Sequence, residues 1–173
     1  FETLPMAKKN SFAAKGLRLD WSSDISLSEE DAGILYRTAL IPAYRHRLSR
    51  HLLTEDALRI NLSDNITNLN LLRGENPLPV RGDIDSFTRQ RVIIDHSYLA
   101  GFATLRQDLH SAFHVGYLEE MYAGLSGEIL YRPFAKPWAI GTEMTLALKR
   151  DPLTPLALGI SPDHVLTGHI NGY

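Results

Sequence analysis

The sequence contains no cysteine and no long apolar run. The absence of cysteine from 173 residues excludes disulfides, thiolate-bound zinc and cysteine nucleophiles. No stretch approaches the roughly 18–20 consecutive apolar residues that a membrane-spanning helix needs, and the mean hydropathy is only -0.15. A helical membrane protein is therefore excluded. A membrane β-barrel is not excluded, because only half of the residues in its strands are apolar.

An excess of charge of one sign is missing as well. The formal net charge is -2 and the isoelectric point is near 6.4. Nucleic-acid binders usually carry a basic face, so we expect no nucleic-acid partner. The sequence shows no signal peptide, and it ends inside an expected strand. We therefore expect a piece of a longer chain, with a flexible lead-in or linker over residues 1–15 and a β-barrel segment over 16–173 that is incomplete at both ends.

Apolar and polar residues alternate along much of the chain, as is typical of strands with two unlike faces. The clearest alternation covers residues 17–27, 58–63, 109–117 and 138–149. Further strands are expected at residues 34–45, 91–101, 122–132 and 164–173. Several of these exceed the usual 5–6 residues of soluble strands and match the roughly 9–11 of a tilted membrane strand. The predicted fold is all-β, with about eight strands in an antiparallel, up-and-down outer-membrane β-barrel.

Two segments could form helices instead. Residues 29–40 could follow an N-cap at Ser28, and residues 48–62 have a possible cap at Thr54. We favour strands in both, with residues 51–58 the most ambiguous. The links are long at residues 66–90 and 151–163 and short at 103–107, 118–120 and 133–137. In an up-and-down order both long links fall on one side of the sheet, as the longer loops of outer-membrane barrels do.

Alternation alone does not say whether the apolar face meets lipid or a second sheet in a soluble β-sandwich. Aromatic residues concentrate near strand ends, as in the girdles of membrane barrels: Tyr117, Tyr122, Tyr131, Phe134 and Trp138. The polar face is densely charged. Its lumen-facing binding candidates are Arg18, Asp20, Glu128, Arg132, Glu143 and Lys149. The residues alone leave both interpretations open.

The sequence offers little that points to catalysis. Paired carboxylates cleave glycosidic bonds at separations of about 5–10 Å, and Glu128 and Glu143 are expected to be cross-strand neighbours. A hydrated charge ladder explains them better, so we assign no catalytic residue and expect no enzyme. His110 and His114 lie roughly 13 Å apart on a strand, too far to share a metal. We therefore expect no metal and no cofactor.

One long block resembles a known family. Residues 116–134, GYLEEMYAGLSGEILYRPF, and the following KPWAIG of residues 136–141 closely resemble the most distinctive block of the YjbH/GfcD-like family. Those outer-membrane proteins are tied to bacterial exopolysaccharide and capsule production. Shorter stretches at residues 78–84, 149–151 and 167–169 also resemble that family, whereas the Pro-rich residues 152–162 depart from it.

The resemblance implies a location and a process. It implies a non-catalytic barrel in the bacterial outer membrane that takes part in producing or exporting a polysaccharide. The implied partners are outer-membrane lipid, the polysaccharide chain and other exopolysaccharide-export proteins. Two alternatives stay open, namely a soluble periplasmic β-domain that binds polysaccharide or an export partner, and a carbohydrate-active enzyme.

Overall fold

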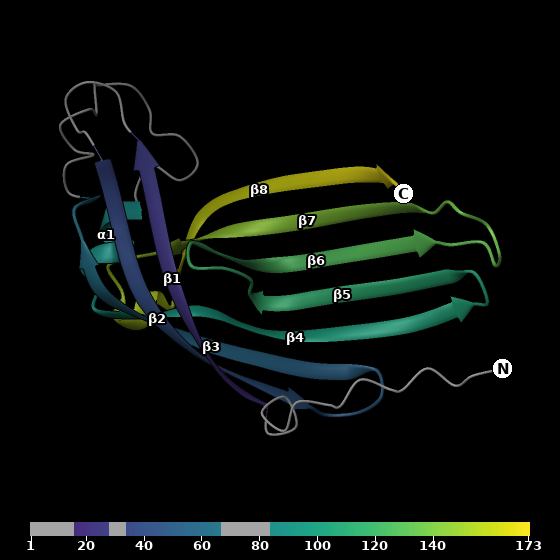
Figure 1. Ribbon diagram of the computed structural model, residues 1–173, viewed down its shortest axis with the longest axis horizontal. Helices are drawn as coiled ribbons and strands as arrows, with labels where there is room; N and C mark the ends of the chain where they lie inside the picture. Colours follow the sequence, from purple (N-terminus) through teal and green to yellow (C-terminus); the bar gives the residue numbers. More distant parts are fainter. Residues whose placement is uncertain (1–15, 28–33, 67–83) are drawn as a thin grey trace, which may run out of the picture.

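The computed structural model describes residues 16–27, 34–66 and 84–173, and most of them lie in β-strands (Figure 1). The strands are β1 (Leu17–Leu27), β2 (Ile34–Arg47), β3 (Leu52–Asp64), β4 (Val92–Arg106), β5 (Leu109–Tyr117), β6 (Tyr122–Tyr131), β7 (Ile140–Asp151) and β8 (Gly159–Gly172). The helix α1 (Ile84–Arg89) and a 3-10 turn (Pro155–Ala157) complete the elements. None of the helices in the described ranges is long and apolar enough to cross a membrane.

The strands form one antiparallel sheet in the order β1 to β8, each beside its neighbour in sequence. This confirms the predicted all-β, up-and-down arrangement. The sheet is not closed, because β1 and β8 are not paired with each other in the described part of the chain. The helical alternatives for 29–40 and 48–62 are wrong wherever the structure describes them, since residues 34–47 and 52–64 are strands. The predicted lead-in, residues 1–15, lies outside the described residues.

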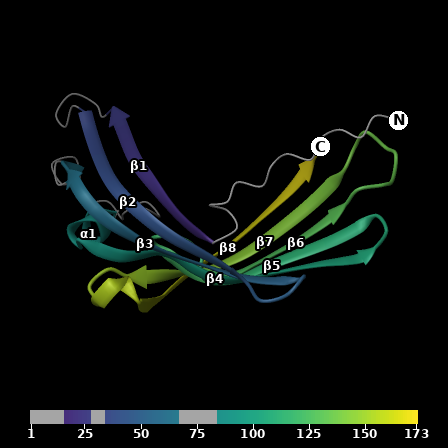
Figure 2. The same ribbon diagram turned by 60° about the horizontal axis from the view of Figure 1, so that its bottom comes forward.

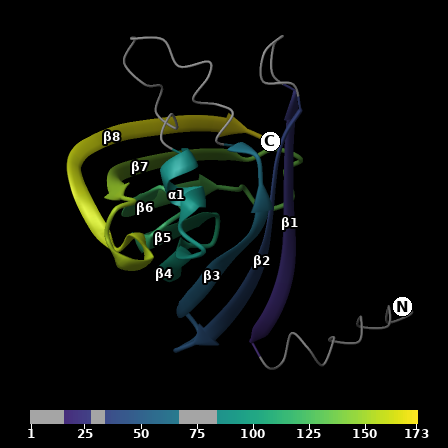
Figure 3. The same cartoon turned by 90° about the vertical axis from the view of Figure 1, so that its left-hand side faces the viewer.

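The sheet is strongly curved. It bends from β1 round to β8, and α1 lies inside the curve (Figures 2 and 3). The side chain of Thr88 on α1 contacts Arg37 on β2, with 3.4 Å between Thr88 Oγ1 and Arg37 Nη1. The face that carries Arg37 is therefore the concave face. The opposite face is convex.

The two faces differ in chemistry as the alternation predicts. Strand pairing places Leu19, Trp21, Phe113, Leu125 and Leu146 on the convex face. Trp21 is 63% exposed, Phe113 40% and Leu146 39%, so no second layer among the described residues covers them. A soluble β-sandwich would bury this face. Here the apolar side chains point outward and the charged side chains line the hollow side.

The buried core occupies one end of the concave side. Phe87 of α1 packs there with Ile93, Met121, Tyr122 and Ala157. We call this the capped end, because α1 and the links 118–121 and 152–158 meet there. The links at the other end, the turn end, are residues 48–51, 107–108 and 132–139. The expected placement of both long links on one side is thereby confirmed.

Four details of the links and strand bounds differ from the expectation. The link expected at 103–107 is shorter, because β4 extends to Arg106 and β5 begins at Leu109. Residues 84–89 of the long link 66–90 form a helix. The link expected at 151–163 ends earlier, because β8 begins at Gly159 and contains Pro162. Proline is tolerated there because Pro162 lies at the register shift where the regular pairing of β8 with β7 is interrupted. The strand expected from residue 138 begins at Ile140.

Aromatic residues do lie at both ends of the strands. Tyr131 and Trp138 are in contact at the turn end, with ring centroids 5.9 Å apart, and Phe134 is 78% exposed beside them. Tyr117 ends β5 at the capped end. Tyr122 differs from the predicted pattern, because it faces the concave side and is buried in the core.

Candidate binding surface on the concave face

The six predicted lumen-facing residues share the concave face but form no single cluster. Arg18 and Asp20 lie on β1, and Glu128 pairs directly with Glu143 across β6 and β7, as expected. Lys149 pairs with Tyr122 at the capped end. Arg132 follows β6 at the turn end, where it lines a shallow hollow. Their roles in binding stay predictions.

One half of the concave face, on β1 to β4, is neutralised by ion pairs. Arg18 contacts Asp20, with 2.5 Å between Nε and Oδ2, and lies 3.6 Å from Glu55. Glu55 also accepts a 2.7 Å hydrogen bond from Arg45 and lies 3.6 Å from His96. A buried carboxylate needs such partners, because desolvation otherwise disfavours its charge. Arg18 and Asp20 are therefore already engaged with residues of the protein.

A second ion-pair group lies at the capped end. The buried Arg37 contacts Glu120 at 2.8 Å and Asp24 at 3.0 Å. Arg59 contacts Asp95 at 2.8 Å and lies 3.6 Å from the same Glu120. Glu120 comes from the link between β5 and β6, so it joins the two sides of the curved sheet.

Sequence reasoning missed this group for a structural reason. Register shifts between Thr38 and Ala39 and between Ala57 and Leu58 change which residues share a face. Bulges of this kind depend on the partner strand and leave little trace in one sequence. The charged residues in segments 34–45 and 55–59 were the only feature of the sequence that pointed to this ion-pair group.

The other half of the concave face, on β4 to β8, is hollowed. A hollow of about 500 Å³ lies between Tyr98, Tyr122, Ala147 and Val165. A row of small residues lies beneath it, because Tyr98 pairs with Gly116, Gly116 with Gly124, and Gly124 with Ala147. Replacing either glycine by a larger residue would be strained, since Gly116 has φ +137 and Gly124 φ +155.

A row of polar side chains crosses the same hollow. Cross-strand pairs connect His114 to Ser126, Ser126 to Thr145 and Thr145 to Thr167. The Thr145 hydroxyl donates to Ser126 Oγ at 2.9 Å, and the Ser126 hydroxyl donates to Glu143 at 3.3 Å. Each hydroxyl can both donate and accept. The row can therefore offer hydrogen bonds to a ligand rich in hydroxyl groups.

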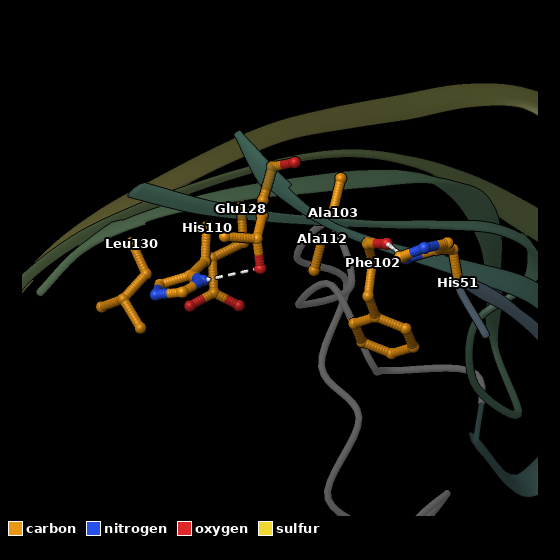
Figure 4. A pocket seen from close by; sticks show the side chains of 9 residues that line it. His51, Phe102, Ala103, His110, Ala112, Glu128 and Leu130 are labelled. Atoms are coloured by element: carbon orange, nitrogen blue, oxygen red, sulfur yellow. Dashed lines mark hydrogen bonds between the residues drawn. The ribbon is translucent and has the colours of Figure 1, made fainter. Parts of the chain in front are cut away.

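Two further hollows extend toward the turn end. One, of about 290 Å³, is lined by Phe102, His110, Glu128 and Leu130, whose side chains project from the same side of the sheet (Figure 4). The other, of about 370 Å³, shares Glu128 and Leu130 and adds Trp138. Because Glu128 pairs with Glu143 of the first hollow, the three hollows adjoin one another, and we call them together the trough.

The trough contains two carboxylates without a cationic partner. Glu128 makes no hydrogen bond or ion pair within ranges 16–27, 34–66 and 84–173, and Glu143 contacts only hydroxyl groups there. The same ranges contain no group of three metal-ligating side chains placed to hold an ion. The trough thus offers hydrogen bonding, aromatic contact and negative charge, and its turn end also carries the positive charges of Arg132 and Lys136.

Comparison with known proteins agrees with the sequence resemblance. A curated relative, the "Uncharacterized lipoprotein YjbH" of Escherichia coli (strain K12), is 26% identical over 178 residues. The alignment covers 98% of this chain but 26% of the relative, so the chain spans about a quarter of the relative's length. No solved structure matches the chain. The family model for YjbH, described as exopolysaccharide biosynthesis protein YbjH, matches residues 3–173. The chain therefore belongs to the YjbH exopolysaccharide biosynthesis family.

Proposed function

We propose that this chain is the β-barrel part of a bacterial outer-membrane protein that takes part in the production or export of exopolysaccharide or capsule. In this role it catalyses no reaction. The observation that carries the proposal is the orientation of the sheet, whose apolar convex face is exposed while its charged face is concave. This is the arrangement of a membrane barrel, which turns apolar side chains to lipid and polar ones to its lumen.

The two free edges support the same proposal. A bilayer offers no water to unpaired backbone N–H and C=O groups, so only a closed barrel can span it with strands. β1 and β8 each carry an unpaired edge in the described structure. The curated relative is about four times as long as the stretch that aligns with this chain, since the match covers 26% of it. We propose that further strands of a longer protein pair with both edges and complete the cylinder.

The concave face supports the link to polysaccharide. Hydroxyl, carboxylate and aromatic side chains line a series of adjoining hollows on β4 to β8. Such a surface can hold a hydrated sugar chain by many weak contacts. The partners proposed are accordingly outer-membrane lipid, the polysaccharide and other export proteins.

Fractionation of cells that produce the full-length protein tests the proposal. We expect the protein in the outer-membrane fraction, extracted only by detergent, and we expect its deletion to reduce surface polysaccharide. A protein that stays monodisperse without detergent would support the periplasmic alternative. Cleavage of sugar chains by the purified protein would contradict the non-catalytic role.

A further inference from the structure

We infer that the hollow of about 500 Å³ between Tyr98 and Tyr122 is a glycan subsite selective for neutral or amino sugars over uronates. The inference rests on the proposed function only in taking polysaccharide as the class of ligand. It assigns a position on the sheet, a set of contacts and a charge preference to that ligand.

The size and lining of the hollow suit a sugar unit. Its volume of about 500 Å³ falls within the roughly 300–1,000 Å³ of small-molecule sites. Tyr98 supplies an aromatic surface, and Ala147 and Val165 supply apolar contacts. An aromatic ring with a polar tip suits a ligand that has an apolar C–H face and polar edges.

The polar groups of the hollow match a polyol. Ser126, Thr145 and Thr167 occupy neighbouring strands at one level of the sheet. Their hydroxyl groups can donate to and accept from hydroxyl groups of a sugar. A site that hydrogen-bonds hydroxyl groups in this way discriminates against ligands that lack them, because its own polar groups are then left unpaired.

Charge decides which sugars fit. Glu143 lines the hollow and contacts only hydroxyl groups of the described residues, and no Arg or Lys is part of the lining there. The neighbouring hollow adds Glu128, again with no Arg or Lys in its lining. Arg132 and Lys136 line only the third hollow, at the turn end. Arg18, Arg37 and Arg59 are engaged in ion pairs elsewhere on the concave face. A uronate carboxylate would meet like charge here, whereas a protonated amino group could make a charge-assisted hydrogen bond to Glu143.

Binding of three oligosaccharides of equal length to the full-length protein in detergent tests the inference. The probes are cello-oligomers, which are neutral, chitosan oligomers, which carry amino groups, and oligogalacturonate, which carries carboxylates. Calorimetry should show binding of the first two. Oligogalacturonate should bind at least about tenfold more weakly than the neutral probe.

Two substitutions on β7 provide a matched pair. Thr145→Val removes a hydroxyl group from the hollow and should weaken binding of the neutral probe several-fold. Thr142→Val makes the same change on the convex face and should leave binding unchanged. Glu143→Gln should remove the advantage of the chitosan oligomer over the neutral one.

Three results would overturn the subsite: binding of none of the probes, preferential binding of oligogalacturonate, or equal effects of the two threonine substitutions. If any of these occurred while surface polysaccharide still depended on the protein, the subsite would be wrong and the proposed function would stand. If deletion left surface polysaccharide unchanged, the proposed function would fail whatever the probes did.

Discussion

At the scale of single residues, Glu120 compensates the charge of two buried arginines. It lies close to two buried guanidinium groups, 2.8 Å from Arg37 and 3.6 Å from Arg59. Glu120→Gln would leave both cations incompletely compensated, and breaking a buried pair costs about 3–5 kcal/mol. We expect a loss of this size in the free energy of unfolding, measured by denaturant titration of the detergent-solubilised protein.

Asp24 supplies the control for this prediction. It also pairs with Arg37, but its side chain is 58% exposed. Exposed ion pairs contribute about 0–1 kcal/mol, so Asp24→Asn should cost much less than Glu120→Gln. Equal losses from the two substitutions would show that Glu120 does not join the two sides of the sheet.

Gly124 is a position that only glycine fits without strain. Its φ is +155, and an added Cβ would lie 2.0 Å from the backbone oxygen of Leu146 on β7. Gly124→Ala should therefore reduce the yield of folded protein, with a strain of roughly 1–3 kcal/mol, as judged by thermal unfolding. Gly127 lies on the same strand with open space around it. Unfolding temperatures lowered equally by Gly127→Ala and Gly124→Ala would refute this explanation.

At the scale of elements, β7 tests the assignment of the two faces. Leu146→Arg would place a charge on the convex face, which in a bilayer costs roughly 2–4 kcal/mol near the midplane. We expect this variant to fail in barrel assembly, measured by its amount in the outer-membrane fraction. Glu143→Gln on the concave face should assemble normally. Normal assembly of both variants would mean that the convex face does not meet lipid.

The buried side chain of Arg150 makes four hydrogen bonds at the capped end, two of them to the β7–β8 link. The guanidinium group of Arg150 donates to the carbonyl oxygens of Ile94, Glu119, Leu156 and Ala157, at 2.8 to 3.1 Å. Arg150→Met would leave these acceptors unpaired, and each buried one costs about 1–3 kcal/mol. Hydrogen exchange over residues 118–121 and 151–158 should become faster.

The exposed Arg132 provides the comparison for that measurement, because it lies at the opposite, turn end of the sheet. Arg132→Met should leave hydrogen exchange at the capped end unchanged. Unaltered exchange in Arg150→Met would show that the link is held by its other contacts.

The strands show how far one sequence predicts such a fold. Regular alternation located β1, β5 and β7, and the short link before Tyr122 set the pairing of β5 with β6. Counting across the turn at 133–137 predicted the pairing of Glu128 with Glu143, which the structure confirms. These features depend only on the alternation of apolar and polar residues within a strand and on the length of the turn between strands.

Features that depend on partner strands were not predictable in the same way. The bulges place an extra residue in β3, at Leu62, and in β4, at Asp95, and the second one helps to decide how Asp95 meets Arg59. The helix α1 is only six residues long and is held by burial of Phe87 rather than by a periodic sequence. The hollow depends on small residues being aligned across three strands, which becomes visible only in the register.

At the scale of the whole molecule, the sheet has the reverse of the usual soluble arrangement. Large apolar side chains cover the convex surface, and ion pairs and hydroxyl groups cover the concave one. The buried core is confined to the capped end. An apolar surface this large requires a partner, and we propose that the partner is the acyl chains of the membrane.

Single-cysteine labelling in intact outer membranes tests this orientation most directly, and these 173 residues contain no native cysteine that would react beside the introduced one. Cysteines replacing Leu125 and Leu146 on the convex face should resist a water-soluble maleimide and react with a lipid-soluble one. Cysteines replacing Ser126 and Thr145 on the concave face should react with the water-soluble reagent. Equal labelling of both sets by the water-soluble reagent, or preferential labelling of the convex set, would contradict the account.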